Sequence, residues 1–482
     1  MNYLDVVLIA EARAKKRAIR SALRRHIHLT RDPLGIVLWQ LGAEPFTAAA
    51  TAWGFGPKEP QVSVPGEPRN RTLSFRALLR LAKDFNPWFE SGQRPDGKTR
   101  SDLPQIVVPN RGTLTLLRRL GRRLAFLPTT GEWAADPELV RMGKHLAFLS
   151  EHARTPGQSL VVVLTDLLST HWATELSSME AQSLPALEAW IEPPKGMSGY
   201  DAARAAERLE IGPVPGLSED EVMDGLLDRF NEERDRETDE SIVGPLRKPI
   251  EKHYRKLVQR GWPFIWRVLK RERGLSEAAS VSRRWTEDKR AIDWHLEWVV
   301  LKGGHLSTRY THKRAAITLR RWEDAQSQLG AERALDDPLR MIASMLKNEA
   351  VVGVVVNVDE ENREQGPVKL VRRPVVTLET ERPCTMPIGK KLWWSGHPKG
   401  KHYVLRSAVD TPRGGSRLEL CLQTSHRSVV RPAEGKEAIF SSHHVKSPFF
   451  AQWPDELPWT HVDSATATTR SVEDATEAWG GA

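Results

Sequence analysis

The spacing of apolar residues changes from helical to alternating near residue 350, and this change limits what the chain can fold into. Before it, apolar side chains recur at three- and four-residue steps, which predicts helices. After it, six short runs rich in β-branched residues are separated by turn sequences such as GHPKG and DTPRGG, which predicts antiparallel strands. We therefore expect an α+β protein: a multi-helical N-terminal and central body followed by a small antiparallel β-barrel-like domain.

A chain of 482 residues is long enough for two to four domains. The sequence GPVPG at 212–216 is typical of a linker and predicts one boundary. The expected units are a helical N-terminal domain at 1–215, a helical bundle at 216–348, a small barrel or sandwich at 349–450, and a mostly disordered tail at 451–482. In the first unit, the apolar, Ala-rich stretch 34–56 fits core helices.

Positive charge is concentrated in the middle of the chain. The whole protein has 71 Lys and Arg against 62 Asp and Glu, a net charge of +9, whereas 246–322 alone holds 20 basic and 7 acidic residues. The preceding stretch, 218–245, has 11 acidic and 3 basic residues, and a capping pattern at Ser218 and Glu221 predicts a helix over 218–240. The basic balance favours a polyanionic partner. Whether the acidic helix neutralises or masks the basic region stays open at this point.

Six tryptophans also lie in 246–322. Helix-ending glycines and apolar residues at three- and four-residue steps predict four helices between residues 245 and 329. Most of these tryptophans fall on apolar helix faces, so we expect them in the core. Trp294 and Trp298 lie one turn apart and are offset from the apolar stripe. They are therefore the expected candidates for exposure and for contact with a ligand or partner.

Basic side chains on several helices are the predicted phosphate contacts. Residues 3–26 are expected to form one helix, on which Arg13, Arg17, Arg20 and Arg24 share a face. A solvated face paired with acidic neighbours explains such a stripe equally well. Four further arginines form a second basic helix face that is not counted among the predicted site residues, Arg118, Arg119, Arg122 and Arg123. The central region adds basic pairs that are expected to face solvent, Arg283, Arg284, Lys289, Arg290, Lys313, Arg314, Arg320 and Arg321.

The C-terminal domain offers a different kind of candidate site. Trp393 and Trp394 are neighbours in one predicted strand, so one should point into the core and the other outward. An outward tryptophan beside Lys399 and Lys401 would provide a stacking platform for a nucleic-acid base, although packing between domains explains it as well.

Residues 92–99, GQRPDGKT, match the glycine, lysine and threonine positions of a phosphate-binding loop at Gly92, Gly97, Lys98 and Thr99. Such a loop normally follows a buried strand and opens a helix. Here it follows a predicted helix and leads into a proline-containing extended run. An exposed turn is therefore the favoured interpretation, with nucleotide binding as the alternative.

Neither a cofactor nor a metal site is expected. Cys384 and Cys421 do not form a CxxC pair, and the histidines lack ligand spacing. The N-terminal segment lacks the charge order of a signal peptide, and no apolar run approaches the roughly 20 residues of a membrane span. We expect a cytoplasmic protein with no membrane contact, and the Ala- and Arg-rich composition favours a bacterial source.

The function that these features favour is non-catalytic, sequence-nonspecific binding of DNA or RNA, or a scaffold role, as a subunit of a nucleic-acid-processing or defence assembly. No catalytic triad, carboxylate pair or dinucleotide-binding loop stands out in the sequence. The first alternative is a protein-interaction subunit that docks an acidic partner. The second alternative is an NTP-binding enzyme that uses the loop at 92–99.

Overall fold

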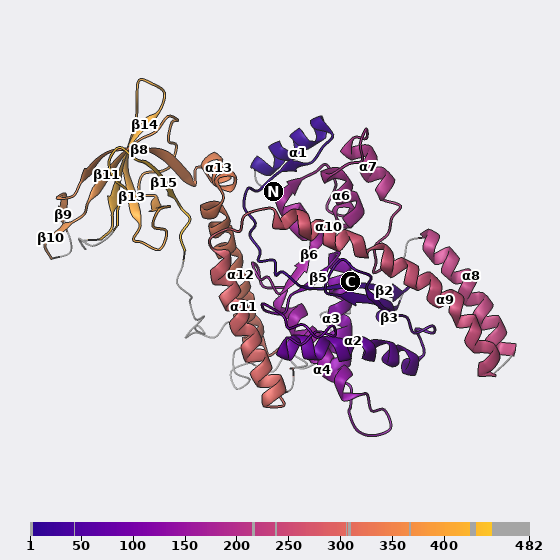
Figure 1. The fold of residues 1–482 in the computed structure, drawn as a ribbon. Coiled ribbons are helices and arrows are strands. Elements are labelled where there is room, and N and C mark those ends of the chain that lie inside the picture. The colour runs from indigo at the N-terminus through magenta and orange to yellow at the C-terminus, as the bar shows by residue number, and fades with distance from the viewer. Residues whose placement is uncertain are drawn as a thin grey trace, which may run out of the picture.

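The computed structural model describes residues 3–42, 44–214, 217–236, 239–304, 306, 310–365, 368–424 and 430–445. The architecture is α+β, as expected: a largely helical body is followed by a six-stranded barrel (Figure 1). The predicted disordered tail, 451–482, lies outside the described residues. Within the described part of the chain, no helix is both long and apolar enough to cross a membrane.

A five-stranded mixed sheet forms the centre of the body. Its strand order is β4-β3-β2-β5-β6. Neighbours β2, β3 and β4 pair antiparallel, whereas β5 and β6 run parallel to β2. The bounds are β2 (Leu34–Leu41), β3 (Glu44–Gly54), β4 (Gln61–Ser63), β5 (Ile106–Val108) and β6 (Val161–Val163).

The prediction of core helices at 34–56 is wrong, because this stretch forms the hairpin of β2 and β3. All eight residues of β2 are buried. Leu34, Ile36 and Leu38 enter one hydrophobic core, while Val37 and Trp39 enter the other. A strand buried on both faces has no alternation of apolar and polar residues, so its sequence does not differ from that of a buried helix.

Helices cover both faces of the sheet. The first face carries α2 (Arg71–Ser91), α3 (Arg111–Ala125), α4 (Pro137–His152) and α11 (Val281–Leu296). The second face carries α5 (Leu164–His171), α6 (Leu184–Ile191), α7 (Gly199–Ala206), α8 (Leu217–Arg236), α9 (Glu240–Arg260) and α10 (Trp262–Arg273). Both cores therefore combine residues from the two sides of the predicted boundary at 215.

The four helices predicted between residues 245 and 329 are present as α9, α10, α11 and α12 (His312–Asp336). They do not pack around one another as a bundle, because α9 and α10 lie on one face of the sheet and α11 on the other. The acidic helix α8 packs beside α9, as Figure 1 shows. It therefore leaves the basic residues of α11 and α12 uncovered.

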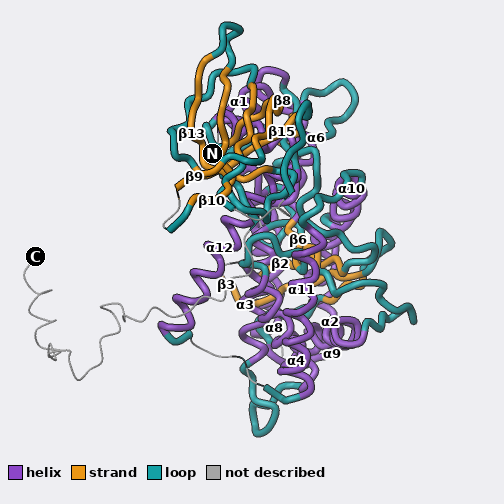
Figure 2. Tube along the Cα trace, turned by 90° about the vertical axis from the view of Figure 1, so that its left-hand side faces the viewer, coloured by secondary structure: helices purple, strands orange, loops and turns teal. Residues whose placement is uncertain are grey.

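The long helix α12 runs down the flank of the body from the side of the barrel (Figures 1 and 2). The buried Asp337 that follows it accepts hydrogen bonds from the backbone N–H groups of Leu23, Arg24 and Leu339. These bonds join the N-terminal segment to the start of α13. The remaining elements of this region are α1 (Tyr3–Lys15), β1 (Ile19–Arg20), β7 (Trp172–Ala173), η1 (Glu180–Gln182), the π-helix η2 (Glu297–Leu301) and α13 (Pro338–Leu346).

The predicted small barrel is confirmed as a closed, antiparallel one with strand order β11-β14-β13-β12-β15-β8. Leu392 and Trp394 of β12 face its core, and Trp393 faces outward, so the predicted alternation is confirmed. The barrel strands are β8 (Ala350–Asp359), β11 (Val375–Glu379), β12 (Lys391–Trp394), β13 (Tyr403–Asp410), β14 (Ser416–Leu422) and β15 (Glu437–Ser441), and a side hairpin contains β9 (Arg363–Gln365) and β10 (Leu370–Arg372).

Two glycines let α3 and α4 cross in close contact. A Cβ atom built on Gly143 would lie 2.5 Å from the backbone nitrogen of Ala125, and one built on Gly121 would lie 2.7 Å from that of Ala147. A Cβ atom at either distance would overlap with the backbone nitrogen, which cannot rotate away as a side chain can. The orientation of α3, and thus of every side chain on its outer face, depends on this crossing.

We predict that Gly143→Ala lowers the free energy of unfolding by about 1–3 kcal/mol, because the added methyl group forces the two helices apart. Gly330→Ala is the matched control, since Gly330 is an exposed helical residue and a methyl group added to it would have no neighbour within 4 Å. It should raise stability by about 0.5–1 kcal/mol. Urea unfolding measures both changes, and equal effects of the two variants would contradict the packing described.

Candidate nucleic-acid interface

The first predicted arginine stripe is not a helix face. Helix α1 ends at Lys15, and Lys16 has a φ of 48°. Arg17 and Arg24 therefore follow the helix as exposed residues, and the guanidinium group of Arg20 lies 4.1 Å from the centre of the Trp172 ring. The prediction of one helix over 3–26 is wrong, because β1 pairs with β7 just after the turn.

Arg284 is buried, contrary to the expectation that the central basic pairs face solvent. Its guanidinium group pairs with the carboxylate of buried Glu332 on α12 and donates hydrogen bonds to the carbonyl oxygens of His26 and Gly157. A buried carboxylate needs such a partner. Arg283 is half-buried and pairs with the same glutamate. Both arginines therefore hold α11 against α12.

Other predicted basic residues of this region do lie at the surface. Lys289 and Arg290 are exposed on α11, and Arg314, Arg320 and Arg321 are exposed on α12. Arg320 forms an ion pair of 3.2 Å with Asp324. The side chain of Lys313 lies outside the described part of the structure.

Trp294 and Trp298 are exposed, as predicted, with 59% and 42% of their surfaces accessible. Their rings are nearly parallel, with an interplanar angle of 8° and centroids 6.5 Å apart. Leu301 beside them is 79% exposed. Charged neighbours of both signs flank the pair, including the ion pair between Glu297 and Lys302. The result is an apolar, nearly neutral patch on the π-helix η2 and the end of α11.

A buried histidine pair lies beneath this patch. The ring nitrogens of His145 on α4 and His295 on α11 lie 2.9 Å apart, and the second ring nitrogen of His145 lies 2.8 Å from a carboxylate oxygen of Glu90. The ring of His295 stacks on Phe148 at 4.1 Å. Burial lowers the pKa of His145 below its usual value and lowers that of His295 to about 3. Both rings are therefore neutral near pH 7.

The outward tryptophan of the barrel is partly covered. The ring of Trp393 stacks on His444, with centroids 4.1 Å apart, and it lies 5.7 Å from the ring of His402. Lys399 and Lys401 are exposed. A base would have to displace His444 or use the other face of Trp393, so the structure offers less of a platform here than the sequence indicates.

Residues 92–99 form a tight hairpin turn after a helix. Gly92 ends α2 in the left-handed region, with a φ of 79°, and Gln93 pairs with Thr99 as an isolated antiparallel bridge. The turn leads to β5 without opening a helix. Lys98 extends beside Asp96, with 4.0 Å between the charged atoms. A phosphate-binding loop needs a strand before it and a helix after it, and this stretch has neither.

The crevice between the diverging strands β2 and β5 is filled by the chain itself. These strands pair only near their starts, at Leu34 and Gly35. Beyond that point, segment 211–213 lies against both strands. The backbone N–H of Gln40 donates a hydrogen bond of 2.8 Å to the Pro213 carbonyl oxygen. The side-chain amide of Asn110 donates to the carbonyl oxygens of residues 211 and 212. Open α/β sheets usually bind ligands at this edge. Segment 211–213 therefore occupies part of this edge.

In the described ranges, no group of three or more His, Cys, Asp or Glu side chains is arranged to hold a metal ion. Several histidines of these ranges have protein partners. His171, for example, is hydrogen-bonded to the buried carboxylate of Glu272 at 2.6 Å.

The outer face of α3 is basic along its whole length. Its sequence, RGTLTLLRRLGRRLA, contains five arginines and no acidic residue. Four of these arginines are exposed and Arg118 is half-buried, while the leucines of the opposite face are buried in the core. Arg111, at the start of the helix, forms an ion pair of 2.8 Å with Asp166 of α5. We call this surface the α3 arginine face; its members are Arg111, Arg118, Arg119, Arg122 and Arg123.

The α3 arginine face extends toward α12. Glu151, near the end of α4, lies 3.9 Å from Arg118 and accepts a hydrogen bond from the Tyr310 hydroxyl just before α12. Arg154 stacks on Trp322 of α12, 4.1 Å from the ring centre. These contacts join the end of α4, which packs against α3, to α12 and to Tyr310 before it.

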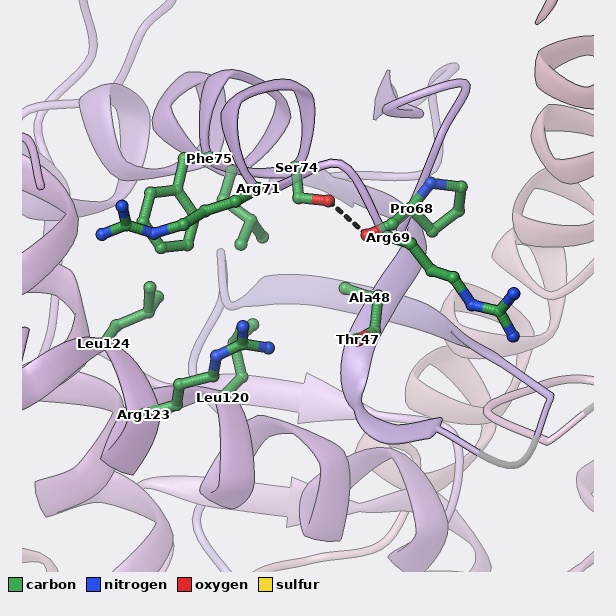
Figure 3. A pocket seen from close by; sticks show the side chains of 11 residues that line it. Thr47, Ala48, Pro68, Arg69, Arg71, Ser74, Phe75, Leu120, Arg123 and Leu124 are labelled. Atoms are coloured by element: carbon green, nitrogen blue, oxygen red, sulfur yellow. Dashed lines mark hydrogen bonds between the residues drawn. The ribbon is translucent and has the colours of Figure 1, made fainter. Parts of the chain in front are cut away.

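A pocket of about 160 Å³ opens at the C-terminal end of the same face. Figure 3 shows Arg71 at the start of α2 on one side and Arg123 of α3 on the other. Apolar side chains form much of the wall. The lining residues are Thr47, Ala48, Pro68, Arg69, Arg71, Ser74, Phe75, Leu78, Leu120, Arg123 and Leu124.

The predicted site residues did not include the α3 arginine face or this pocket. The sequence does carry a signal for the first, since four arginines recur in pairs along a Leu-rich helix. It carries none for the second, because residues 47, 71 and 123 meet only through the packing of β3, α2 and α3. Comparisons with known proteins gave no match to a family model, to a curated protein or to a solved structure.

The histidine pair gives a pH-dependent prediction. The unfolded chain binds a proton at His295 with a pKa near 6.5, whereas the folded protein binds it only at about 3, so acid favours unfolding. The stability that His295 contributes is present above pH 6.5 and is lost as the pH falls below it. When the pH falls from 7 to 5, the free energy of unfolding should therefore decrease by about 1–2 kcal/mol less in His295→Phe than in the parent.

Chemical denaturation at the two pH values measures this difference. His397→Gln, which changes an exposed histidine of the barrel, is the control and should follow the parent. An acid sensitivity that is unchanged in His295→Phe would contradict the neutral, buried pair.

Proposed function

We propose that this protein is a non-catalytic subunit that binds nucleic acid without sequence specificity, and that the α3 arginine face is its main phosphate-binding surface. The observation that carries the proposal is a helix with five arginines, no acidic residue and a fully packed opposite face. Arginines on a rigid helix form charge-assisted hydrogen bonds to phosphate oxygens and lose little order on binding.

The neighbouring groups support an extended contact. Arg154 stacks on Trp322 of α12, and Arg314 and Arg321 are exposed on the same helix. The acidic helix α8 packs beside α9 and so does not compete for this surface. Phosphate contacts of this kind fix a protein on the backbone but read no bases, which favours binding to many sequences.

A non-catalytic role is supported by the filled crevice at β2 and β5. The backbone carbonyls of 211–213 are hydrogen-bonded to Asn110 and Gln40 where a reacting group would be expected in an open sheet. A role in holding or positioning nucleic acid for other subunits fits both the filled crevice and the arginine face.

Binding should weaken steeply with salt, with log K falling by about 0.9 per log unit of salt for each phosphate contact. The double variant Arg119→Ala/Arg122→Ala removes two exposed charges from the centre of the face. We predict weaker binding to a labelled DNA duplex and a slope that is shallower by about 1–2, measured by fluorescence anisotropy at several salt concentrations.

Arg204→Ala/Arg208→Ala is the matched control, because it removes the same charge near α7, on the opposite face of the sheet. It should leave the slope of the parent unchanged. Equal slopes in the parent and both variants would exclude the α3 arginine face as the contact, and an absence of binding to duplex and single-stranded DNA and RNA would overturn the proposed function.

The exposed patch of Trp294, Trp298 and Leu301 favours a second candidate function, in which the chain docks a protein partner. Aromatic residues are enriched in the buried centres of protein interfaces, and the patch has no excess of positive charge to attract a polyanion. An acidic partner that docks instead on the α3 arginine face is the version of this alternative that the charge of the chain favours.

Trp294→Ala/Trp298→Ala separates the two candidates. If the patch docks a protein, the nuclease-treated parent should co-purify with a stoichiometric partner, and the variant should lose that partner while its affinity for DNA stays within about twofold of the parent. Met179→Ala, which removes another highly exposed apolar side chain, is the control. Loss of DNA affinity with no change in bound protein would reject the docking role.

A further inference from the structure

The pocket between α2 and α3 has a lining that favours an anion. Three arginines, Arg69, Arg71 and Arg123, contribute to it, and none of the lining residues is acidic. The pocket also lies at the N-terminal end of the 21-residue helix α2, where the helix dipole adds partial positive charge. The charge of the lining and the dipole therefore act in the same direction.

Arg71 is held in position before any ligand arrives. Its guanidinium group lies 4.9 Å from the centre of the Phe75 ring and 5.7 Å from that of Trp133, and it donates one hydrogen bond of 2.8 Å to the Trp133 carbonyl. A guanidinium group has five N–H donors. The other donors of Arg71 have no acceptor among the described residues, so a bound anion would find them already oriented.

The size of the pocket limits what enters. About 160 Å³ corresponds to roughly five water molecules at their volume in the liquid, which is too little for a strand to pass through. It is enough for a terminal phosphate group, and the apolar wall of Phe75, Leu78 and Leu120 suits the adjoining sugar or base. The pocket adjoins Arg119 and Arg122 through α3 itself, so a strand lying on the α3 arginine face can end there.

A terminal phosphate also differs in charge from the phosphates within a strand. A phosphate monoester carries a charge of about −1.5 to −2 near pH 7 and presents three acceptor oxygens, whereas an internal diester carries −1. Two or more guanidinium groups that line one pocket favour the group with the higher charge and more acceptors.

We propose that the pocket lined by Arg71 and Arg123 binds the terminal phosphate monoester of a nucleic-acid strand whose backbone lies on the α3 arginine face. This inference rests on the proposed function, and it adds that the protein recognises strand ends. The 5′ and 3′ phosphates share the chemistry that the pocket recognises, so the experiment has to distinguish them.

The test uses the full-length protein and three otherwise identical DNA duplexes, with 5′-phosphate, 3′-phosphate or only hydroxyl ends. One phosphorylated duplex should bind about tenfold more tightly than the hydroxyl duplex at pH 7.5. Arg71→Ala should abolish the preference while leaving the affinity for hydroxyl ends within about twofold. Arg123→Ala, which changes the opposite wall, should reduce the preference too.

Arg76→Ala is the control, because Arg76 is exposed on α2 but does not line the pocket. It should keep the preference of the parent. Acidification to pH 5 provides a second readout, since the second ionisation of a phosphate monoester has a pKa near 6 and the preference should shrink as that proton is gained. Thermal unfolding of each variant checks that the fold is retained.

Equal affinity of the parent for all three duplexes, with the expected salt dependence, would overturn this inference and leave the proposed function in place. A preference that survives in both Arg71→Ala and Arg123→Ala would also overturn it. No binding to any duplex would overturn the proposed function itself.

Discussion

The structure depends on the burial of β2 from both sides. Leu34, Ile36 and Leu38 pack against α2 and α3, while Val37 and Trp39 pack against the helices of the other face. The two cores lie on opposite faces of this sheet, so side chains of the same few strands contact both helix layers. Each large apolar side chain buried here stabilises the fold by about 1.5–3 kcal/mol.

Charge is distributed around these cores according to what burial allows. The buried carboxylate of Glu332 is paired with a buried arginine, Arg284. Where a helix has one face in the core and no acidic residue, its arginines lie on the outer face, as on α3. The first arrangement holds the helices together, and the second provides the positive surface of the proposed function. The same type of residue thus has two roles, which its surroundings determine.

The sequence predicts those helices and strands in which apolar residues recur with a regular period. The helices from α9 to α13 and the six barrel strands follow from apolar spacing and turn residues, and the exposure of Trp294 and Trp298 follows from their offset from the apolar stripe. The hairpin of β2 and β3 does not, since burial on both faces removes the alternation. A helix over residues 3–26 is wrong because the pairing of β1 with β7, over 150 residues away, ends α1 early.

The candidate site was only partly predictable for a related reason. Arg284 looks like a surface residue until Glu332, 48 residues later, is placed beside it. The pocket needs Thr47, Arg71 and Arg123 to meet, which only the tertiary packing decides. The arginine face of α3 is local, so the sequence does show it. Contacts between residues far apart in sequence determine on which of the basic helices the arginines lie at the surface.

The most direct test of the claim that α3 faces nucleic acid is photo-crosslinking from a single position. Thr115 lies exposed in the middle of the α3 arginine face, and Tyr200 lies exposed on α7, on the opposite side of the sheet. A photoreactive amino acid at position 115 should crosslink to labelled DNA in low salt, and one at position 200 should not. Crosslinks from position 200 that equal or exceed those from position 115 would contradict the claim.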